Sequence, residues 1–171
     1  MIKIDCDVFV DKNSTVWTVT DTVWIEGNLE FKSGPTIESD PAQATRTVLM
    51  IVDNESDRTN SSQITIANGT NFSAPSSPKA YIMLVSMNED AENGGSNVAI
   101  DMGQSSNGDV IVYAGHGEIS LANSITLKEV TAYLINMGNN STIEYESGLI
   151  NLNFTSGPGG GFEIGDWNEV E

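Results

Sequence analysis

The sequence predicts an all-β fold, a single-domain parallel β-solenoid (β-helix), and three observations lead to it. Apolar runs are short, rich in β-branched residues, and end at Gly, Asn, Asp or Ser, which is typical of strands. These runs recur in pairs, with first members that start 20 to 33 residues apart. Helical periodicity is almost absent, and Thr45, Thr47 and Val48 weaken the one mildly helical segment, 42–50.

Five pairs of apolar runs form the repeat. They are TVWI (22–25) with NLEF (28–31), VLMIV (48–52) with QITI (63–66), YIMLVS (81–86) with NVAI (97–100), VIVY (110–113) with EISL (118–121), and VTAYLI (130–135) with STIEY (141–145). A propeller blade needs about 40 residues, so five blades exceed the chain length. We therefore expect about five irregular rungs of two or three strands, each strand pairing with its equivalent in the next turn. An antiparallel sandwich is the alternative, although its tight hairpin dipeptides are scarce.

The alternation in EISLANSITLKE (118–129) predicts apolar side chains inside the solenoid and polar ones outside. Asn and Gly at the corners would adopt left-handed backbone conformations at low cost. The uneven spacing of the repeats predicts that segments 53–62 and 88–96 are loops extruded from corners on one side of the solenoid.

One domain of 171 residues is expected, with a cap at each end because an uncovered terminal rung exposes strand edges. We assign 1–13 to the N-terminal cap, 14–155 to the rungs, and 156–171 to a Gly-rich hinge and C-terminal cap. Within the last segment, Phe162, Ile164 and Trp167 would cover apolar surface.

The chain is strongly acidic, with 24 Asp and Glu against seven Lys and Arg and a net charge of −17. It has no basic patch, which argues against nucleic acid and against anionic membranes as partners. The single cysteine, Cys6, excludes an intrachain disulfide. No secretory signal and no long apolar run is present, so we expect either a cytoplasmic protein or one whose export or membrane segment precedes this sequence.

Several stretches carry a family resemblance: VIVYAGHGEISLANS (110–124), KEVTAYLINMGNNSTIEYESGL (128–149), the ending GFEIGDWNEVE (161–171) and the opening TVTDTVWIEGNLEFKSGPTI (18–37). In these stretches the chain resembles the β-solenoid domain of bacterial PilX-like, pilin-associated surface proteins. Asn140, Ile143, Tyr145 and Leu149 stand at the positions of that family's closing motif, and Trp167 and Glu169 at its terminal motif.

The resemblance implies a non-enzymatic structural or adhesive module of a minor-pilin-like protein, extracellular on the cell surface or a type IV pilus. Its partners would be other pilus or surface subunits, or surface glycans. Such proteins usually carry an N-terminal membrane helix, which this sequence lacks, so contact with a membrane is expected only through such a helix.

Two acidic loops are candidate calcium sites, because calcium takes six to eight oxygen ligands. The candidate ligands alternate with other polar residues and are Asp53, Glu55, Asp57, Glu89, Asp90 and Glu92. The alternative is a pair of solvated acidic loops without metal. No other cofactor and no catalytic residue is expected. The only histidine, His116, has Glu118 two residues away, but its flanking glycines favour a corner residue without a chemical role.

Three further function classes remain open. A carbohydrate-active β-helix enzyme would need a groove with convergent carboxylates and a base, and a carbohydrate-binding domain would need exposed aromatic residues such as Trp17 and Trp24. Tyr81, Tyr113 and Tyr133 recur at related points of the repeats and are expected to stack as a structural column. A self-assembling cytoplasmic solenoid polymer, such as a bactofilin, would need exposed apolar ends.

Overall fold

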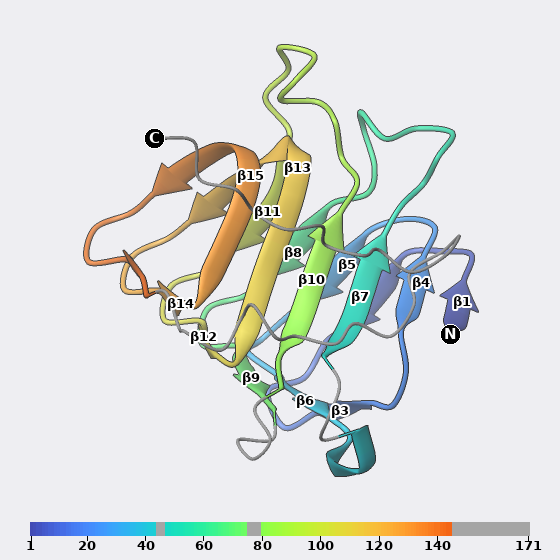
Figure 1. Ribbon diagram of the computed structural model, residues 1–171, viewed down its shortest axis with the longest axis vertical. Coiled ribbons are helices and arrows are strands. Elements are labelled where there is room, and N and C mark those ends of the chain that lie inside the picture. Colours follow the sequence, from blue (N-terminus) through green and yellow to red (C-terminus); the bar gives the residue numbers. More distant parts are fainter. Residues whose placement is uncertain (44–46, 75–79, 145–171) are drawn as a thin grey trace, which may run out of the picture.

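The computed structural model describes residues 1–43, 47–74 and 80–144 of the chain (Figure 1). The end of the predicted rungs (145–155), with Tyr145 and Leu149, lies outside the described residues. So do the Gly-rich hinge and the C-terminal cap (156–171), with Phe162, Ile164, Trp167 and Glu169. The described chain is almost entirely β, with one short 3₁₀ turn, η1 (Pro41–Gln43). Residues 48–50 of the mildly helical segment are strand, because the run VLMIV is buried throughout.

The strands are short, apart from β13 and β15, and cover the predicted apolar runs. They are β1 (Ile2–Ile4), β2 (Val8–Val10), β3 (Val16–Val19), β4 (Val23–Ile25), β5 (Leu29–Phe31), β6 (Thr36–Ser39), β7 (Val48–Val52), β8 (Ile64–Ile66), β9 (Asn71–Ser73), β10 (Ile82–Ser86), β11 (Val98–Met102), β12 (Asn107–Gly108), β13 (Val110–Leu121), β14 (Thr126–Leu127), β15 (Glu129–Met137) and β16 (Thr142–Ile143).

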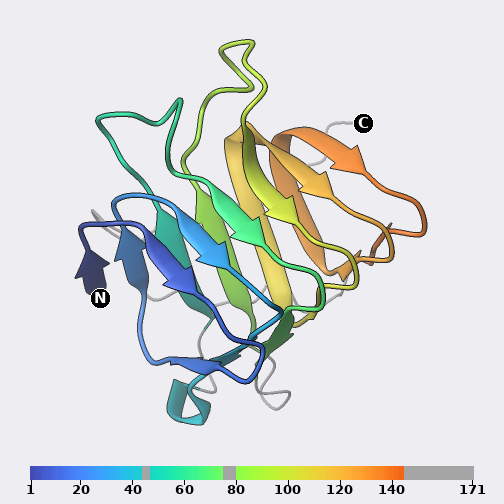
Figure 2. The same cartoon turned by 180° about the vertical axis from the view of Figure 1, so that it is seen from behind.

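Every strand pair in the described part of the chain is parallel, which excludes the antiparallel sandwich there. Each strand from β1 to β9 pairs with the strand three places later in the chain. One side therefore carries β1, β4, β7 and β10, and the opposite side β2, β5, β8 and β11 (Figures 1 and 2). A third, shorter sheet has the order β12-β9-β6-β3.

The long strand β13 joins the two sides of the curled sheet. Its first part, from Val110 to Tyr113, pairs with β10, whereas the part from Glu118 to Leu121 pairs with β11. The sequence predicted two strands with a corner at residues 115–117, and the structure forms one continuous strand whose two halves have different neighbours. Strand β15 follows β13 through both halves, with a register shift at the same place.

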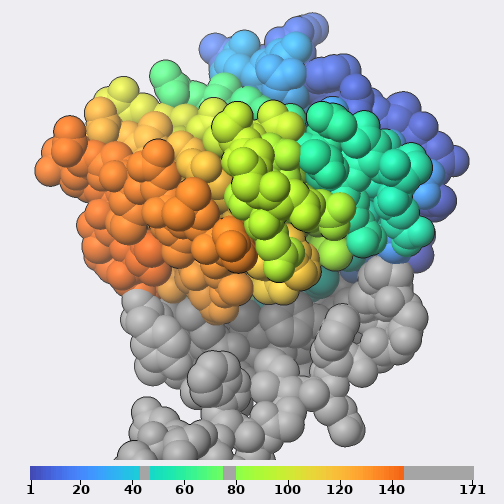
Figure 3. All heavy atoms as spheres, turned by 90° about the horizontal axis from the view of Figure 1, so that it is seen from above, coloured from blue at the N-terminus to red at the C-terminus, as the bar shows by residue number. Residues whose placement is uncertain are grey.

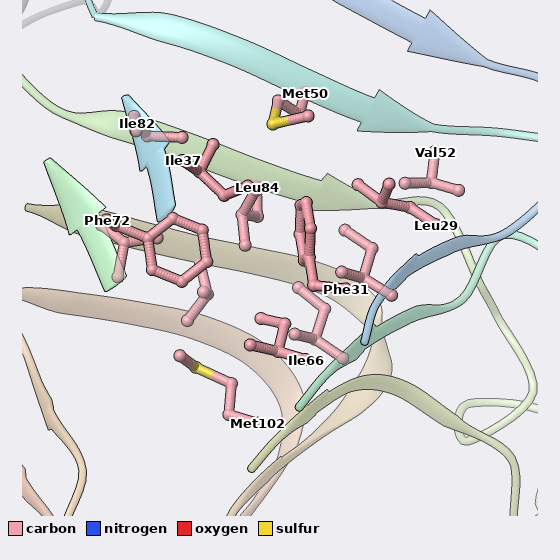
Figure 4. Close-up of a cluster of buried hydrophobic side chains, with 14 of the residues drawn as sticks. Leu29, Phe31, Ile37, Met50, Val52, Ile66, Phe72, Ile82, Leu84 and Met102 are labelled. Atoms are coloured by element: carbon pink, nitrogen blue, oxygen red, sulfur yellow. The ribbon is translucent and has the colours of Figure 1, made fainter. Parts of the chain in front are cut away.

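The core lies between these layers and is filled by alternate side chains of the strands (Figure 4). Phe31 is at its centre, with ring centroids 6.0 Å from Phe72 and 6.3 Å from Trp17. Leu29 and Phe31 are fully buried, whereas Glu30 between them points outward, as the period of two requires. The predicted inward apolar pattern is thus confirmed for this strand.

The sequence pattern predicted polar side chains on the outward face of the strands, but the outward face of β7 and β10 is apolar, like their inward face. Leu49, Ile51 and Val85 point away from the main core, yet each is less than one tenth exposed, and Met83 and Met87 pack against them. The sequence holds the reason, since a continuous apolar run such as VLMIV is typical of a strand buried on both faces.

The segments that join β5 to β6, β8 to β9, β11 to β12, β13 to β14 and β15 to β16 contain left-handed backbone, which was expected of corners. Positive φ angles occur there at Ser33, Gly34, Gly69, Ser105, Ser124 and Asn140. Serine is the commonest residue at these positions, where Asn or Gly was expected. Neighbouring corners are bonded to each other: the Asn68 side chain accepts from the amide of Gln104 at 2.9 Å, and Asn123 accepts from Asn139 at 2.8 Å.

The N-terminal residues belong to the same parallel arrangement. Strand β1 pairs with β4, and β2 with β5, in the register that later strands continue. The segment 1–13 therefore contributes strand pairs, and its separate role as a cap stays a prediction.

Candidate functional site

The two predicted loops lie side by side at one edge of the structure, which confirms that both extend from the same side (Figure 3). The side-chain amide of Asn88 donates to the carbonyl oxygens of Thr59 and Ser61, at 3.3 and 2.8 Å. The amide of Asn97 donates to the same Thr59 carbonyl at 3.0 Å. Residues 53–63 and 87–97, together with His116, are called the loop cluster below.

Buried polar groups give the loop cluster its shape. Asn88 is fully buried, and its Oδ1 accepts from the backbone amide of Asp90 at 3.1 Å. Ser86 donates through Oγ to the carbonyl of Ser62 at 2.5 Å, and Ser62 accepts from the amide of Asn54 at 2.7 Å. Because buried polar groups are costly when unpaired, these bonds favour one arrangement of the two loops.

Asp53 and Arg58 form a bidentate ion pair at the base of the first loop. Arg58 Nε donates to Asp53 Oδ1 at 2.8 Å, and its second nitrogen to Oδ2 at 3.0 Å. The Asp53 side chain is only 5% exposed and that of Arg58 31%. The hydrogen bonds that Arg58 donates to Asp53 raise the pKa of Arg58, so the guanidinium stays charged. Both carboxylate oxygens of Asp53 are therefore already engaged.

We expect Arg58→Met to lower the free energy of unfolding by about 1–3 kcal/mol, because it leaves the buried Asp53 carboxylate without its partner. Urea denaturation checks this, with Glu55→Gln on the exposed tip of the same loop as the control. Asp53→Asn combined with Arg58→Met should cost less than Arg58→Met alone, since no unpaired charge is buried. Equal losses in the three variants would contradict the assignment.

The other predicted calcium ligands do not converge on one point. Asp57 accepts from the backbone and side-chain amides of Asn60, at 3.2 and 2.8 Å, and Asp90 accepts from the amide of Asn97 at 2.7 Å. Glu55 and Glu92 are exposed, and Glu89 is half-buried. Across residues 1–43, 47–74 and 80–144, no three His, Cys, Asp or Glu side chains form a group that could hold a metal ion.

The calcium assignment stays a prediction. Arg58 engages both carboxylate oxygens of Asp53, whereas Asp57 and Asp90 accept through one oxygen each. If calcium binds, the melting temperature should be higher in calcium than in chelator at matched ionic strength, and magnesium should not reproduce the rise. Equal melting temperatures in calcium and in chelator would end the prediction.

His116 is paired with Glu92 of the second loop, and not with Glu118. Its Nδ1 lies 2.5 Å from Glu92 Oε2, and its backbone carbonyl accepts from the Glu92 amide at 3.1 Å. Gly117 lies beside it, where an added Cβ would clash with the Cβ of Ala99 and stand 2.9 Å from the Asn88 carbonyl oxygen, so a larger residue would displace β11 or the loop. His116 thus attaches the second loop to β13, and both members of the pair are exposed to solvent.

The aromatic residues fall into separate places. Trp17 and Phe9 line a shallow, open depression of about 480 Å³ at the N-terminal edge, with Asp11, Lys12 and Thr15. Trp24 lies elsewhere, on the outward side of β4, and its indole Nε1 donates to the Asp53 carbonyl at 3.4 Å. The predicted tyrosine column is wrong, because Tyr113 pairs with Val85 and Thr131 in neighbouring strands.

Sequence reasoning found both loops but missed what holds them. The spacing of Asp53 and Arg58 was a visible signal, since one of only two arginines stands five residues after Asp53, which directly follows a buried strand. The Glu92–His116 contact had no local signal, because 24 residues separate the partners.

Comparisons of the chain with protein-family models, with curated proteins and with solved structures found no match. Within the described residues, no helix is long and apolar enough to cross a membrane.

Proposed function

We propose that this chain is a parallel β-solenoid that serves as a non-enzymatic structural or adhesive module of a pilin-like surface protein. In this assignment the triplets β1–β3, β4–β6, β7–β9 and β10–β12 are successive turns, followed by β13–β14 and β15–β16. That gives six turns, against the predicted five, because the N-terminal residues supply strands of their own.

The loop cluster carries the proposal. Recognition residues are often found on loops that a rigid scaffold positions, and here the side-chain amides of Asn88 and Asn97 hold two long loops together on a stack of parallel strands. The exposed tips present Glu55, Asn93 and the Glu92–His116 pair to solvent. An acidic, polar surface of this kind suits another surface or pilus subunit that offers basic groups.

Antibody labelling of the natural full-length product tests the proposal. The cells that produce it are labelled intact, and sheared surface fibres are labelled separately, with a cytoplasmic protein as the control for lysis. Label on cells or fibres is the expected result. Label that appears only after the cells are broken open would overturn the surface assignment.

A carbohydrate-binding role is the second candidate, and the depression lined by Phe9 and Trp17 favours it. Aromatic rings beside Asp11, Lys12 and Thr15 combine the stacking and hydrogen-bonding groups that sugars use. Screening the purified chain on immobilised glycans tests this. Glycan binding that is lost in the double variant Asp11→Ala and Lys12→Ala, and kept in Trp24→Ala, would support the carbohydrate-binding role. Absence of binding to every glycan tested would rule this role out.

A further inference from the structure

The two ends of the strand stack are both apolar and both exposed. At the first end, Ile2 is 46% exposed and Val16 56%; at the last end, Ile135 is 39% and Met137 45%. Exposed apolar patches at strand edges are uncommon in monomers, because an edge is a template for pairing with another chain. Among the described strands, β1 pairs only with β4, and β15 only with β13.

The strand register shows what would fit these edges. The column that contains Ile2 continues through Val23, Met50, Leu84 and Val112 to Val130. The column that contains Val8 continues through Leu29, Ile64, Ile100 and Ile119 to Ile135. The column that contains Val10 continues through Phe31, Ile66, Met102 and Leu121 to Met137. Every member of these three columns is apolar, from the first turn to the last.

We propose that copies of this chain associate end to end, with β1 and β2 of one copy pairing in parallel with β15 of the next. Because all strands run in the same direction, a second copy shifted along the stack keeps its strands parallel to those of the first. Ile2 would then lie beside Val130, Val8 beside Ile135, and Val10 beside Met137. The interior columns continue across the junction without a polar residue.

Charge at the junction is also compatible with this pairing. In the continued register Lys3 falls opposite Thr131, whose neighbour on the same side of the strand is Glu129. Such diagonal neighbours lie within reach of long side chains. The overall charge of −17 opposes association at long range, so added salt should strengthen assembly by screening it.

The two junction surfaces differ from each other, so the contact is heterologous and need not close on itself. This property separates it from a symmetric dimer, which would stop at two copies. End-to-end association also differs from glycan binding in the N-terminal depression, because a bound glycan would leave β15 exposed. The inference is independent of where the protein is displayed, and its test uses purified protein.

Sedimentation of the full chain, over a range of concentrations and at low and about 0.5 M salt, is the first measurement. The expected result is a mass that rises beyond twice the 18.3 kDa monomer with concentration and salt. Ile2→Lys and Ile135→Lys each place a charge at one end, and each alone should remain monomeric. Mixed together they should form heterodimers and nothing larger, because each retains one intact end.

Thr65→Lys is the matched control, since Thr65 is exposed on β8 in the middle of the stack, and it should assemble as the unaltered chain does. A chain that stays monomeric at every concentration overturns the proposal. So does a chain that assembles only after residues 145–171 are removed, because that segment would then cover the end. Assembly that stops at a dimer, or that survives in both single variants, also overturns it.

Discussion

Gly108→Ala should lower the free energy of unfolding by about 3 kcal/mol, the sum of a positive-φ penalty and a lost buried hydrogen bond. Gly108 has a φ of +121° and pairs with Phe72 of β9. An added Cβ would overlap the Phe72 carbonyl oxygen and stand 2.7 Å from the carbonyl carbon. That oxygen accepts from the amide of Asp109 at 3.0 Å, so the clash displaces a ladder bond.

Gly69→Ala is the control for Gly108→Ala, and urea denaturation of the two variants compares them. Gly69 also has a positive φ, of +73°, but no atom lies within 4 Å of its added Cβ. Only the backbone penalty of about 1–2 kcal/mol applies there. If the two variants lose the same stability, the close approach of β12 to β9 is not what requires glycine at residue 108.

Phe31→Ala should cost about 3–5 kcal/mol, because it empties the centre of the core. The ring is fully buried and contacts both Trp17 and Phe72 across the inside of the stack. For a chain of this size we expect a fall in melting temperature of roughly 10 °C. Thermal unfolding followed by circular dichroism measures it.

Phe9→Ala removes the same kind of ring from β2, the strand that pairs with β5 at the N-terminal edge. Phe9 is 57% exposed and lies under the Lys32 ammonium, 4.6 Å from the ring centroid. The loss should stay below about 1 kcal/mol, the value of an exposed cation–π contact. A Phe9→Ala variant as unstable as Phe31→Ala would mean that the inward and outward faces of β2 and β5 are exchanged.

Much of the local structure could be predicted from the sequence. The runs VLMIV, YIMLVS and VIVY became β7, β10 and the start of β13, because β-branched residues bounded by turn formers favour strands wherever they occur. The strands β6, β9 and β12 were harder to locate. They are only two to four residues long, and β9 and β12 contain Asn or Gly, which are typical of turns rather than strands.

The candidate site was predicted less completely than the strands. Acidic residues in two loops suggested calcium, since composition alone does not distinguish a ligand from a carboxylate that holds a turn. Asp57 and Asp90 accept backbone amides of their own loops, and Asp53 holds Arg58. Only the folded positions of the amides and of the guanidinium show which of these oxygens the protein itself engages.

The sequence by itself determined the all-β class, the parallel arrangement of the strands that carry the apolar runs, and the position of the two long loops. All of these depend on short-range patterns, namely apolar alternation and the placement of Gly, Asn and Ser. The tertiary structure decided which residues meet: Glu92 with His116, Asn88 with Thr59, and the apolar columns that run from Ile2 to Val130. Those contacts depend on the register between turns, and register is set by the packing of the whole core rather than by any single segment.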